Sequence, residues 1–145
     1  MRVETYTDQH FASVAHLIHE FHKEAVGEYD REFNLDAVIE TIKTGIPGDC
    51  FLLILDGVCV GLLYGSRLRS PVNGKVIFQE TMWYVEKNYR RYGVKLLNEV
   101  EKMLKSEGVS IMIMAVLENS KTEKLKKYYE RIGYRAIETH YMRAL

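Results

Sequence analysis

The sequence has few of the residues that mark specialised classes of protein. Its 145 residues include two cysteines, two prolines and one tryptophan. Two cysteines are too few for the disulfide framework of a small secreted domain, so we expect Cys50 and Cys59 to be buried thiols, with a disulfide between them as the alternative. No apolar run approaches the roughly 18 residues of a membrane helix, and the N-terminus has no apolar signal segment. We therefore expect a cytoplasmic protein without a membrane partner.

Net charge is also lacking, because twenty Lys+Arg balance twenty Asp+Glu. Zero charge excludes a disordered polyelectrolyte and argues against a basic nucleic-acid-binding protein. The balance conceals an asymmetry: residues 1–56 carry four basic and eleven acidic side chains, a net charge of −7, and residues 57–145 carry sixteen and nine, a net charge of +7. A chain of this length is typical of one domain, here residues 1–145.

Hydrophobic periodicity and turn residues divide the chain into expected helices and strands. The expected strands are Val3–Tyr6, Phe51–Leu55, Val58–Arg67, Lys75–Val85, Ile111–Val116 and Tyr134–Met142. The expected helices are Phe11–Ala25, Leu35–Ile42, Leu96–Leu104 and Ser120–Ile132. The order β-α-α-β-β-β-α-β-α-β predicts an α+β fold with a mixed, mostly antiparallel central sheet flanked by helices. The continuous apolar run at Ile111–Val116 predicts a strand buried on both faces.

A basic loop with one glycine stands between a strand and a helix. Free N–H groups and the positive end of the helix dipole make a helix start a site for anions. Gly93 allows close backbone approach, and Arg90, Arg91 and Lys95 add charge suited to a di- or polyphosphate. A solvated loop and helix cap is the plain alternative. A nucleic-acid module that stacks bases on the loop's tyrosines is a third, which the zero net charge disfavours.

Two segments resemble the GNAT superfamily of acyl-CoA-dependent N-acyltransferases. Tyr84-Val85 followed by Asn88-Tyr89-Arg90-x-x-Gly93 is similar to the strand end and pyrophosphate loop of that family. Tyr128-Tyr129-Glu130-Arg131-Ile132-Gly133-Tyr134 is similar to its Phe-Tyr-Glu-Lys-Leu-Gly-Phe signature. The order of elements is also that of the family. The resemblance implies a GNAT-like fold that binds acetyl-CoA as acyl donor and acylates a primary amine of a small molecule or peptide.

The resemblance also implies which residues hold acetyl-CoA. The fourth strand of the family separates from the fifth, and pantetheine lies in the gap. The end of that strand would pair with pantetheine, and the loop would hold the pyrophosphate through backbone N–H groups and the Arg90 side chain. A contact of asparagine with pantetheine maps to Asn119. The implied residues are Trp83, Tyr84, Val85, Arg90, Arg91, Tyr92, Gly93, Val94, Lys95 and Asn119.

Tyr129 matches the family tyrosine that protonates the departing thiolate. The alternative is a core aromatic, since it shares a helix face with other apolar residues. Glu80 is the candidate base, because strand alternation places it among the apolar side chains Val76, Phe78, Met82 and Tyr84, where burial moves a carboxyl pKa toward neutrality. The alternative for Glu80 is an ion pair with Arg67 or Arg69 on the neighbouring strand.

The sequence departs from the family pattern in the phosphate loop. Lys95 stands where the family has a small residue, and the leucine pair Leu96-Leu97 comes about two residues early. A lysine there would either reach a phosphate or crowd the ligand. These departures favour the alternative function, a catalytically weak or inactive acyl-CoA-binding regulatory module.

Three further groups of residues bear on partners. His16, His19 and His22 have a spacing that brings side chains together on a helix, but no further ligand type accompanies them, so we expect no metal site. The basic side chains from Lys121 to Arg135 would face solvent or meet the adenosine end of CoA. The acidic first helices overhang the acceptor site in the family, which implies a cationic amine as acceptor. Small family members often pair through their sheets, so a homodimer is also expected.

Overall fold

The computed structural model describes residues 1–27, 30–45, 49–117, 122–143 and 145. These form two compact units, Met1–Ala115 and Val116–Leu145. The elements of the first unit are β1 Arg2–Thr5, α1 Phe11–Phe21, α2 Leu35–Gly45, β2 Cys50–Leu55, β3 Val58–Arg69, β4 Val76–Val85, α3 Gly93–Ser106 and β5 Ile111–Ile113. The second unit contains α4, Thr122–Arg131. Within the described ranges, no helix is both long and apolar enough to cross a membrane.

The sheet lies entirely in the first unit and has the strand order β1-β2-β3-β4-β5. Successive strands from β1 to β4 pair antiparallel, and β5 pairs parallel to β4 after a crossover through α3. The β2–β3 hairpin turns at Asp56 and Gly57, both with positive φ, as its Asp-Gly sequence predicts. The predicted α+β class and mixed, mostly antiparallel sheet are confirmed.

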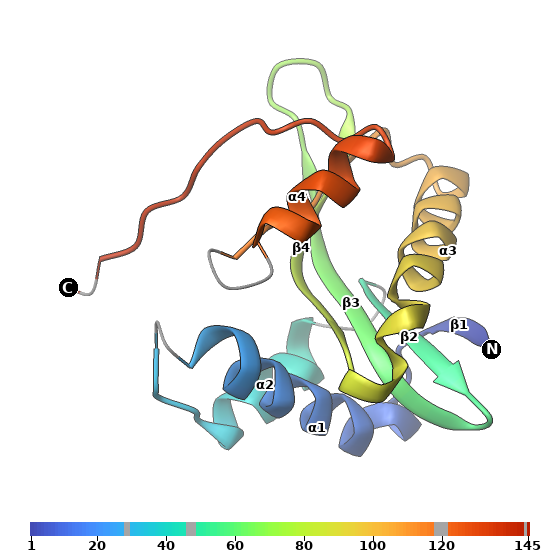
Figure 1. Cartoon of the computed structure of the whole chain (residues 1–145), viewed down its shortest axis with the longest axis vertical. Coiled ribbons are helices and arrows are strands. Elements are labelled where there is room, and N and C mark those ends of the chain that lie inside the picture. The colour runs from blue at the N-terminus through green and yellow to red at the C-terminus, as the bar shows by residue number, and fades with distance from the viewer. Residues whose placement is uncertain (28–29, 46–48, 118–121, 144) are drawn as a thin grey trace. The chain divides into compact units, whose positions relative to one another are not determined.

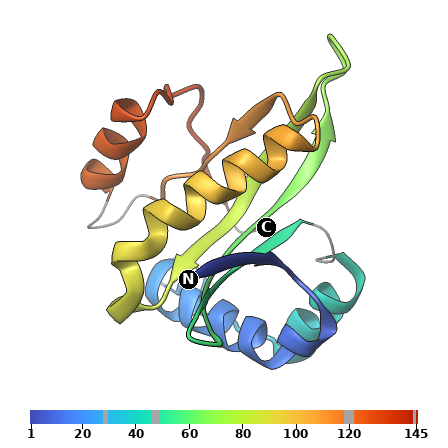
Figure 2. The ribbon, with the colours of Figure 1, turned by 90° about the vertical axis from the view of Figure 1, so that its right-hand side faces the viewer.

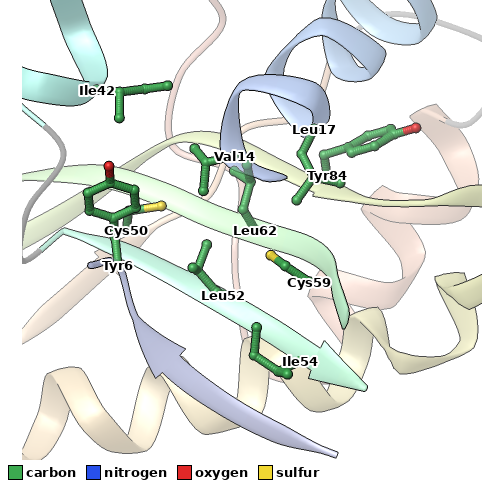
Figure 3. Close-up of a cluster of buried hydrophobic side chains, with 10 residues drawn as sticks. All are labelled: Tyr6, Val14, Leu17, Ile42, Cys50, Leu52, Ile54, Cys59, Leu62 and Tyr84. Carbon is green, nitrogen blue, oxygen red and sulfur yellow. The ribbon is translucent and has the colours of Figure 1, made fainter. Parts of the chain in front are cut away.

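Helices cover both faces of the sheet in the first unit (Figures 1 and 2). On one face, Val14 and Leu17 of α1 and Ile42 of α2 join strand side chains in a buried cluster (Figure 3). Cys50 and Cys59 belong to that cluster as free, buried thiols, as predicted. On the other face α3 buries Leu96, Leu97, Val100 and Leu104. Covered on both sides, β2 and the first half of β3 carry continuous apolar sequences, whereas β3 is exposed from Ser66 to Arg69.

Two expected strands differ from the structure. The fifth ends at Ile113 instead of Val116, and Ile111 is 41% exposed, so the strand is not buried on both faces as predicted. Its single described neighbour is β4, and the ladder between them is short. The described residues between Tyr134 and Met142 form no strand. Alternation alone cannot make a strand, because a strand requires ladder hydrogen bonds to a neighbour.

Candidate active site

Strand β4 loses its parallel neighbour halfway along its length. It pairs with β3 from Val76 to Val85, but with β5 only from Ile77 to Gln79. Beyond Gln79, β3 is the only strand that pairs with β4 in the described part of the sheet. The ladder thus ends in the region where the family resemblance implied a gap between the two strands. Trp83, Tyr84 and Val85, the predicted pantetheine residues, all lie on this second half of β4.

Glu80 lies where the two strands separate. Its side chain is buried, and its Oε2 accepts a hydrogen bond from the backbone N–H of Ala115 at 2.8 Å. Burial raises the pKa of the Glu80 carboxyl to about 7, against a smaller lowering by that hydrogen bond. A carboxyl with this pKa accepts and releases protons near neutral pH, as a general base must.

The expected ion pair of Glu80 with an arginine is not formed in the described part of the chain. Arg67 instead binds Asp49, with Nε 2.9 Å from Oδ1, and Glu107, with Nη2 2.5 Å from Oε2. Arg69 donates to the backbone oxygen of Gly74 at 2.8 Å. Neither arginine neutralises Glu80, so the penalty for burying its charge raises the pKa of its carboxyl.

A β-bulge separates Glu80 from Met82 and Tyr84, which simple alternation places on the same face of β4. Tyr64 pairs with Met82 but the next residue, Gly65, pairs with Glu80, so Thr81 is the extra residue on β4. Met82 and Tyr84 pack with the α1 cluster. Phe78, two residues before Glu80, instead contacts Phe51 on the opposite face, with the ring centroids 6.1 Å apart.

Gly65 permits the close strand approach at this bulge. A Cβ atom on Gly65 would lie 2.3 Å from the backbone oxygen of Gln79 and 2.6 Å from the Phe78 ring. No side chain larger than hydrogen fits there unless a strand moves. Gly65 thus determines where the bulge in β4 occurs, next to Glu80.

The basic loop is a 3-10 helix, Lys87–Tyr92, that runs directly into α3 at Gly93. The Gly93 N–H donates to the Arg90 backbone oxygen, so one of the N–H groups expected to face an anion is engaged within this turn. Gly93 is buried, and a Cβ there would lie 3.6 Å from Trp83 and 3.7 Å from Val85. The loop glycine therefore packs directly on the end of β4.

The charged side chains of the loop point to different partners. The Arg91 guanidinium lies 4.8 Å and the Lys95 ammonium 5.6 Å from the centroid of the Tyr92 ring. Arg90 forms an ion pair with Glu24. Val94 and Lys95 are exposed on the first turn of α3. The structure thus gathers the predicted loop residues at one helix start, with Arg90 held apart from the other two cations.

Sequence reasoning missed a polar cluster that joins this loop to the first helix. Glu24 lies in a π-helical turn, His22–Val26, that continues α1. One oxygen of its carboxylate accepts the Tyr84 hydroxyl at 2.9 Å and the other binds Arg90. Burial, followed by the hydrogen bond to Glu24, raises the pKa of the Tyr84 hydroxyl well above its usual range.

The first-helix histidines have separate surroundings instead of a shared one. His16 Nε2 lies 3.5 Å from Glu86 Oε1, just after β4. The rings of His19 and His22 contact Phe33, at centroid distances of 4.5 and 5.4 Å. These contacts tie α1 to neighbouring segments and give the three residues structural partners.

The predicted acid lies in the second unit. Tyr129 is a buried residue of α4, and its ring lies 5.3 Å from that of Tyr134 and 6.1 Å from that of Tyr128. The helix is followed by Gly133 with a φ of 98°, the left-handed geometry expected of glycine after a helix end. Asn119, the predicted pantetheine contact, lies outside the described residues, as does Ser120.

These features are the ones expected of an acyltransferase: a mixed sheet whose fourth strand stops pairing with the fifth, a buried carboxyl at that point, and a basic helix start after the fourth strand. The family model described as the acetyltransferase (GNAT) family matches residues 12–134. The chain belongs to this family and is by class an acyl-CoA-dependent N-acetyltransferase. A search of curated proteins found no matching sequence.

Solved structures share this fold over the whole chain. Ribosomal-protein-alanine N-acetyltransferase from Brucella melitensis biovar Abortus 2308 is 17% identical, with a TM-score of 0.77 and coverage of 100% of both chains. An aminoglycoside acetyltransferase from an uncultured soil metagenomic sample is 16% identical, with a TM-score of 0.75 and coverage of 99% of this chain and 97% of the other. A transcriptional regulator from Bacillus halodurans C-125 is 12% identical, with a TM-score of 0.73 and coverage of 99% of both. Identities this low show the fold and not the substrate.

Proposed function

We propose that this chain, as one domain over residues 1–145, transfers the acetyl group of acetyl-CoA to a primary amine of a small molecule or peptide. The observation that carries the proposal is the buried Glu80 carboxyl at the point where β4 leaves β5. A base is needed there, because an alkylamine is mostly protonated at pH 7 and only its neutral form is a nucleophile. A cytoplasmic location and a homodimer remain predictions.

Two parts of the chain would bind different parts of acetyl-CoA. The second half of β4, from Trp83 to Val85, offers backbone groups to pantetheine, with Asn119 as a further contact. The helix start from Arg91 to Lys95, together with the Arg90 guanidinium, suits the pyrophosphate because cations and a helix N-terminus both favour negative charge. The closeness of Gly93 to Trp83, 3.6 Å from a Cβ placed on the glycine, supports their assignment to one binding site.

Two side chains, Glu80 and Tyr129, would transfer protons during the reaction. Acetyl-CoA, when bound, supplies an acetyl group as a thioester that an amine can attack directly. Glu80 takes a proton from the incoming ammonium, and its pKa of about 7 suits that exchange. Tyr129 would donate its hydroxyl proton to the thiolate sulfur as the carbon–sulfur bond breaks, and the second proton that the nitrogen loses on forming the amide would restore the Tyr129 hydroxyl.

The acceptor is proposed to carry positive charge. Residues 1–56 carry a net charge of −7, and the acids around the first two helices include the exposed Glu32 and Asp36. A potential of one sign raises the local concentration of a ligand of the other sign. Polyamines, lysine-like side chains, aminosugars and peptide N-termini are the candidate amines. The net charge of +7 in the remaining residues suits a polyanionic CoA in the same way.

An acyl-CoA-binding regulatory module is the second candidate function. Three observations favour it: Lys95 replaces a small loop residue, the Gly93 N–H is bonded within the 3-10 turn, and Arg90 is bound to Glu24. Each of them changes how the loop would hold the pyrophosphate, and a donor held in another position is not placed for transfer. Such a module would bind CoA without transferring its acyl group.

Thiol release from acetyl-CoA across a panel of amines separates the two candidates. We expect turnover with at least one amine, highest for those with a second positive charge. Glu80→Gln should lower kcat/KM by about 100-fold or more, and Tyr129→Phe should lower kcat, since positioned proton transfer contributes about 10²–10⁴-fold. Glu99→Gln on the exposed side of α3 is the control and should leave both unchanged. Tight acetyl-CoA binding with no turnover on any amine would favour the regulatory module.

A further inference from the structure

The contact between Glu24 and Arg90 places a carboxylate on the side chain that the proposed function assigns to the pyrophosphate. Both residues belong to the first unit, and their side chains are 33% and 36% exposed. A guanidinium bound to a carboxylate has its charge compensated and part of its donor fork occupied. A phosphate that approaches Arg90 therefore meets a neutral pair instead of a free cation.

We propose that Glu24 competes with the phosphates of acyl-CoA for Arg90 and so sets the affinity of the chain for its acyl donor. This inference rests on the proposed function. Exchanging a carboxylate for a phosphate on Arg90 is a substitution of one anion for another, so the energy of the existing ion pair is subtracted from the energy of binding. Glu24 thus lowers the affinity for the acyl donor, and the reduction grows with the strength of the ion pair between Glu24 and Arg90.

Arg90, and not Glu24, is the partner that moves in this exchange. Glu24 is also held by the hydroxyl of Tyr84, a β4 residue that is 7% exposed. The Tyr84 ring packs against Phe21, with centroids 6.2 Å apart, and lies in the cluster with Leu17 of α1 (Figure 3). Arg90 lies on a 3-10 helix with no buried residues, so its side chain can reach an outside ligand while Glu24 stays on Tyr84.

The attachment of α1 does not depend on this one ion pair. His16 contacts Glu86 two helical turns before Glu24, and the apolar cluster holds Val14 and Leu17. Removing the charge of Glu24 should therefore leave the fold in place. Glutamine is the suitable replacement, because its amide oxygen can still accept the Tyr84 hydroxyl while its side chain carries no charge for Arg90.

The experiment measures acetyl-CoA dissociation constants by calorimetry for the wild-type chain and for Glu24→Gln. We expect the variant to bind about three- to fivefold more tightly at low salt, the range that a half-exposed ion pair allows. The gain should shrink at high salt, where the pair is already screened. Glu99→Gln is the matched control: it makes the same charge change in another ion pair of the first unit, where Glu99 pairs with Lys102 at 2.7 Å. Its affinity should equal that of the wild type.

Two further arms identify Arg90 and the pyrophosphate as the elements involved. S-acetylpantetheine lacks the pyrophosphate, so Glu24→Gln should leave its affinity unchanged. In an Arg90→Gln background the effect of Glu24→Gln on acetyl-CoA should vanish, since the competing pair no longer exists.

The possible failures are distinct. If Glu24→Gln binds acetyl-CoA as the wild type does, Glu24 does not compete and the inference is wrong. If the variant binds more weakly, Glu24 orients Arg90 for the phosphate, which also overturns it. If the wild-type chain binds no acetyl-CoA and releases no thiol, the proposed function fails as well.

Discussion

Glu80→Gln should stabilise the folded chain at alkaline pH, because Glu80 is a buried carboxyl that forms no ion pair among the residues the structure describes. Glutamine has nearly the same shape, and its amide oxygen can accept the Ala115 N–H that Glu80 Oε2 now accepts at 2.8 Å. The substitution therefore removes the charge with little change in packing. Glu80 is 8% exposed, so solvent screens little of the effect.

The magnitude follows from the two pKa values of Glu80. Burial raises the pKa from an ordinary value of 4.5 to about 7 in the folded chain. Between these values the folded chain binds more protons at this position than the unfolded chain, so stability falls as pH rises from 4.5 to 7. Because a tenfold change in proton affinity is worth about 1.4 kcal/mol, the wild-type chain loses about 3 kcal/mol across this window. Glu80→Gln has no such loss.

Urea unfolding of both proteins from pH 5 to pH 8.5 measures this difference. We expect a lead for Glu80→Gln of under about 1 kcal/mol at pH 5 that grows to about 3 kcal/mol at pH 8. Glu99→Gln, whose carboxylate is 44% exposed beside Lys102, should show no comparable trend. A constant difference, or a wild-type chain that gains on the variant as pH rises, would refute the reasoning, since either result means that ionised Glu80 has a stabilising partner.

Two glycines in the site give opposite predictions. Gly65→Ala places a Cβ 2.3 Å from the Gln79 backbone oxygen, so the unfolding free energy should fall by about 3 kcal/mol, and a loss below about 1 kcal/mol in urea unfolding would contradict the strand approach described. Gly93→Ala makes only ordinary contacts, 3.6 Å from Trp83, and its stability should stay within about 1 kcal/mol of wild type. Its acetyl-CoA dissociation constant should nevertheless rise about tenfold if the backbone approaches the pyrophosphate, and an unchanged constant would count against that position.

Local sequence features predicted much of this fold. The Asp-Gly pair at Asp56 and Gly57 gives the β2–β3 hairpin, because a two-residue turn with positive φ depends on those residues alone. Helical periodicity likewise predicted α1 and α3, whose buried residues recur on one side. The loop motif after β4 also predicts a helix start, which the structure has at Gly93, whereas no sequence signal indicates the 3-10 helix from Lys87 to Tyr92.

Alternation alone did not predict on which face of β4 Glu80 lies, because that depends on pairing between strands. Strict alternation put Glu80 with Met82 and Tyr84, but the bulge opposite Gly65 separates them. A glycine inside a predicted strand is a recognised sign of a bulge, so Gly65 was the available signal. Which residue of the partner strand is extra is decided by the ladder and cannot be seen in one strand's sequence.

Patterns within the sequence do not predict contacts between residues that are far apart along the chain. Glu24 and Arg90 are separated by 66 residues, and neither has a sequence neighbour that indicates the other. The acidic character of the first helices was noted, but their charge was assigned to an acceptor alone. The structure shows that one of these acids, Glu24, pairs with Arg90 of the basic loop.

A crystal structure of the chain with acetyl-CoA tests the central claim most directly. We expect pantetheine against the edge of β4 between Glu80 and Val85, with the pyrophosphate at Arg90 and the start of α3. We also expect Arg90 to have exchanged Glu24 for phosphate. Acetyl-CoA bound elsewhere, with the second half of β4 uncovered by ligand, would contradict the assignment of this strand edge as the acyl-donor site.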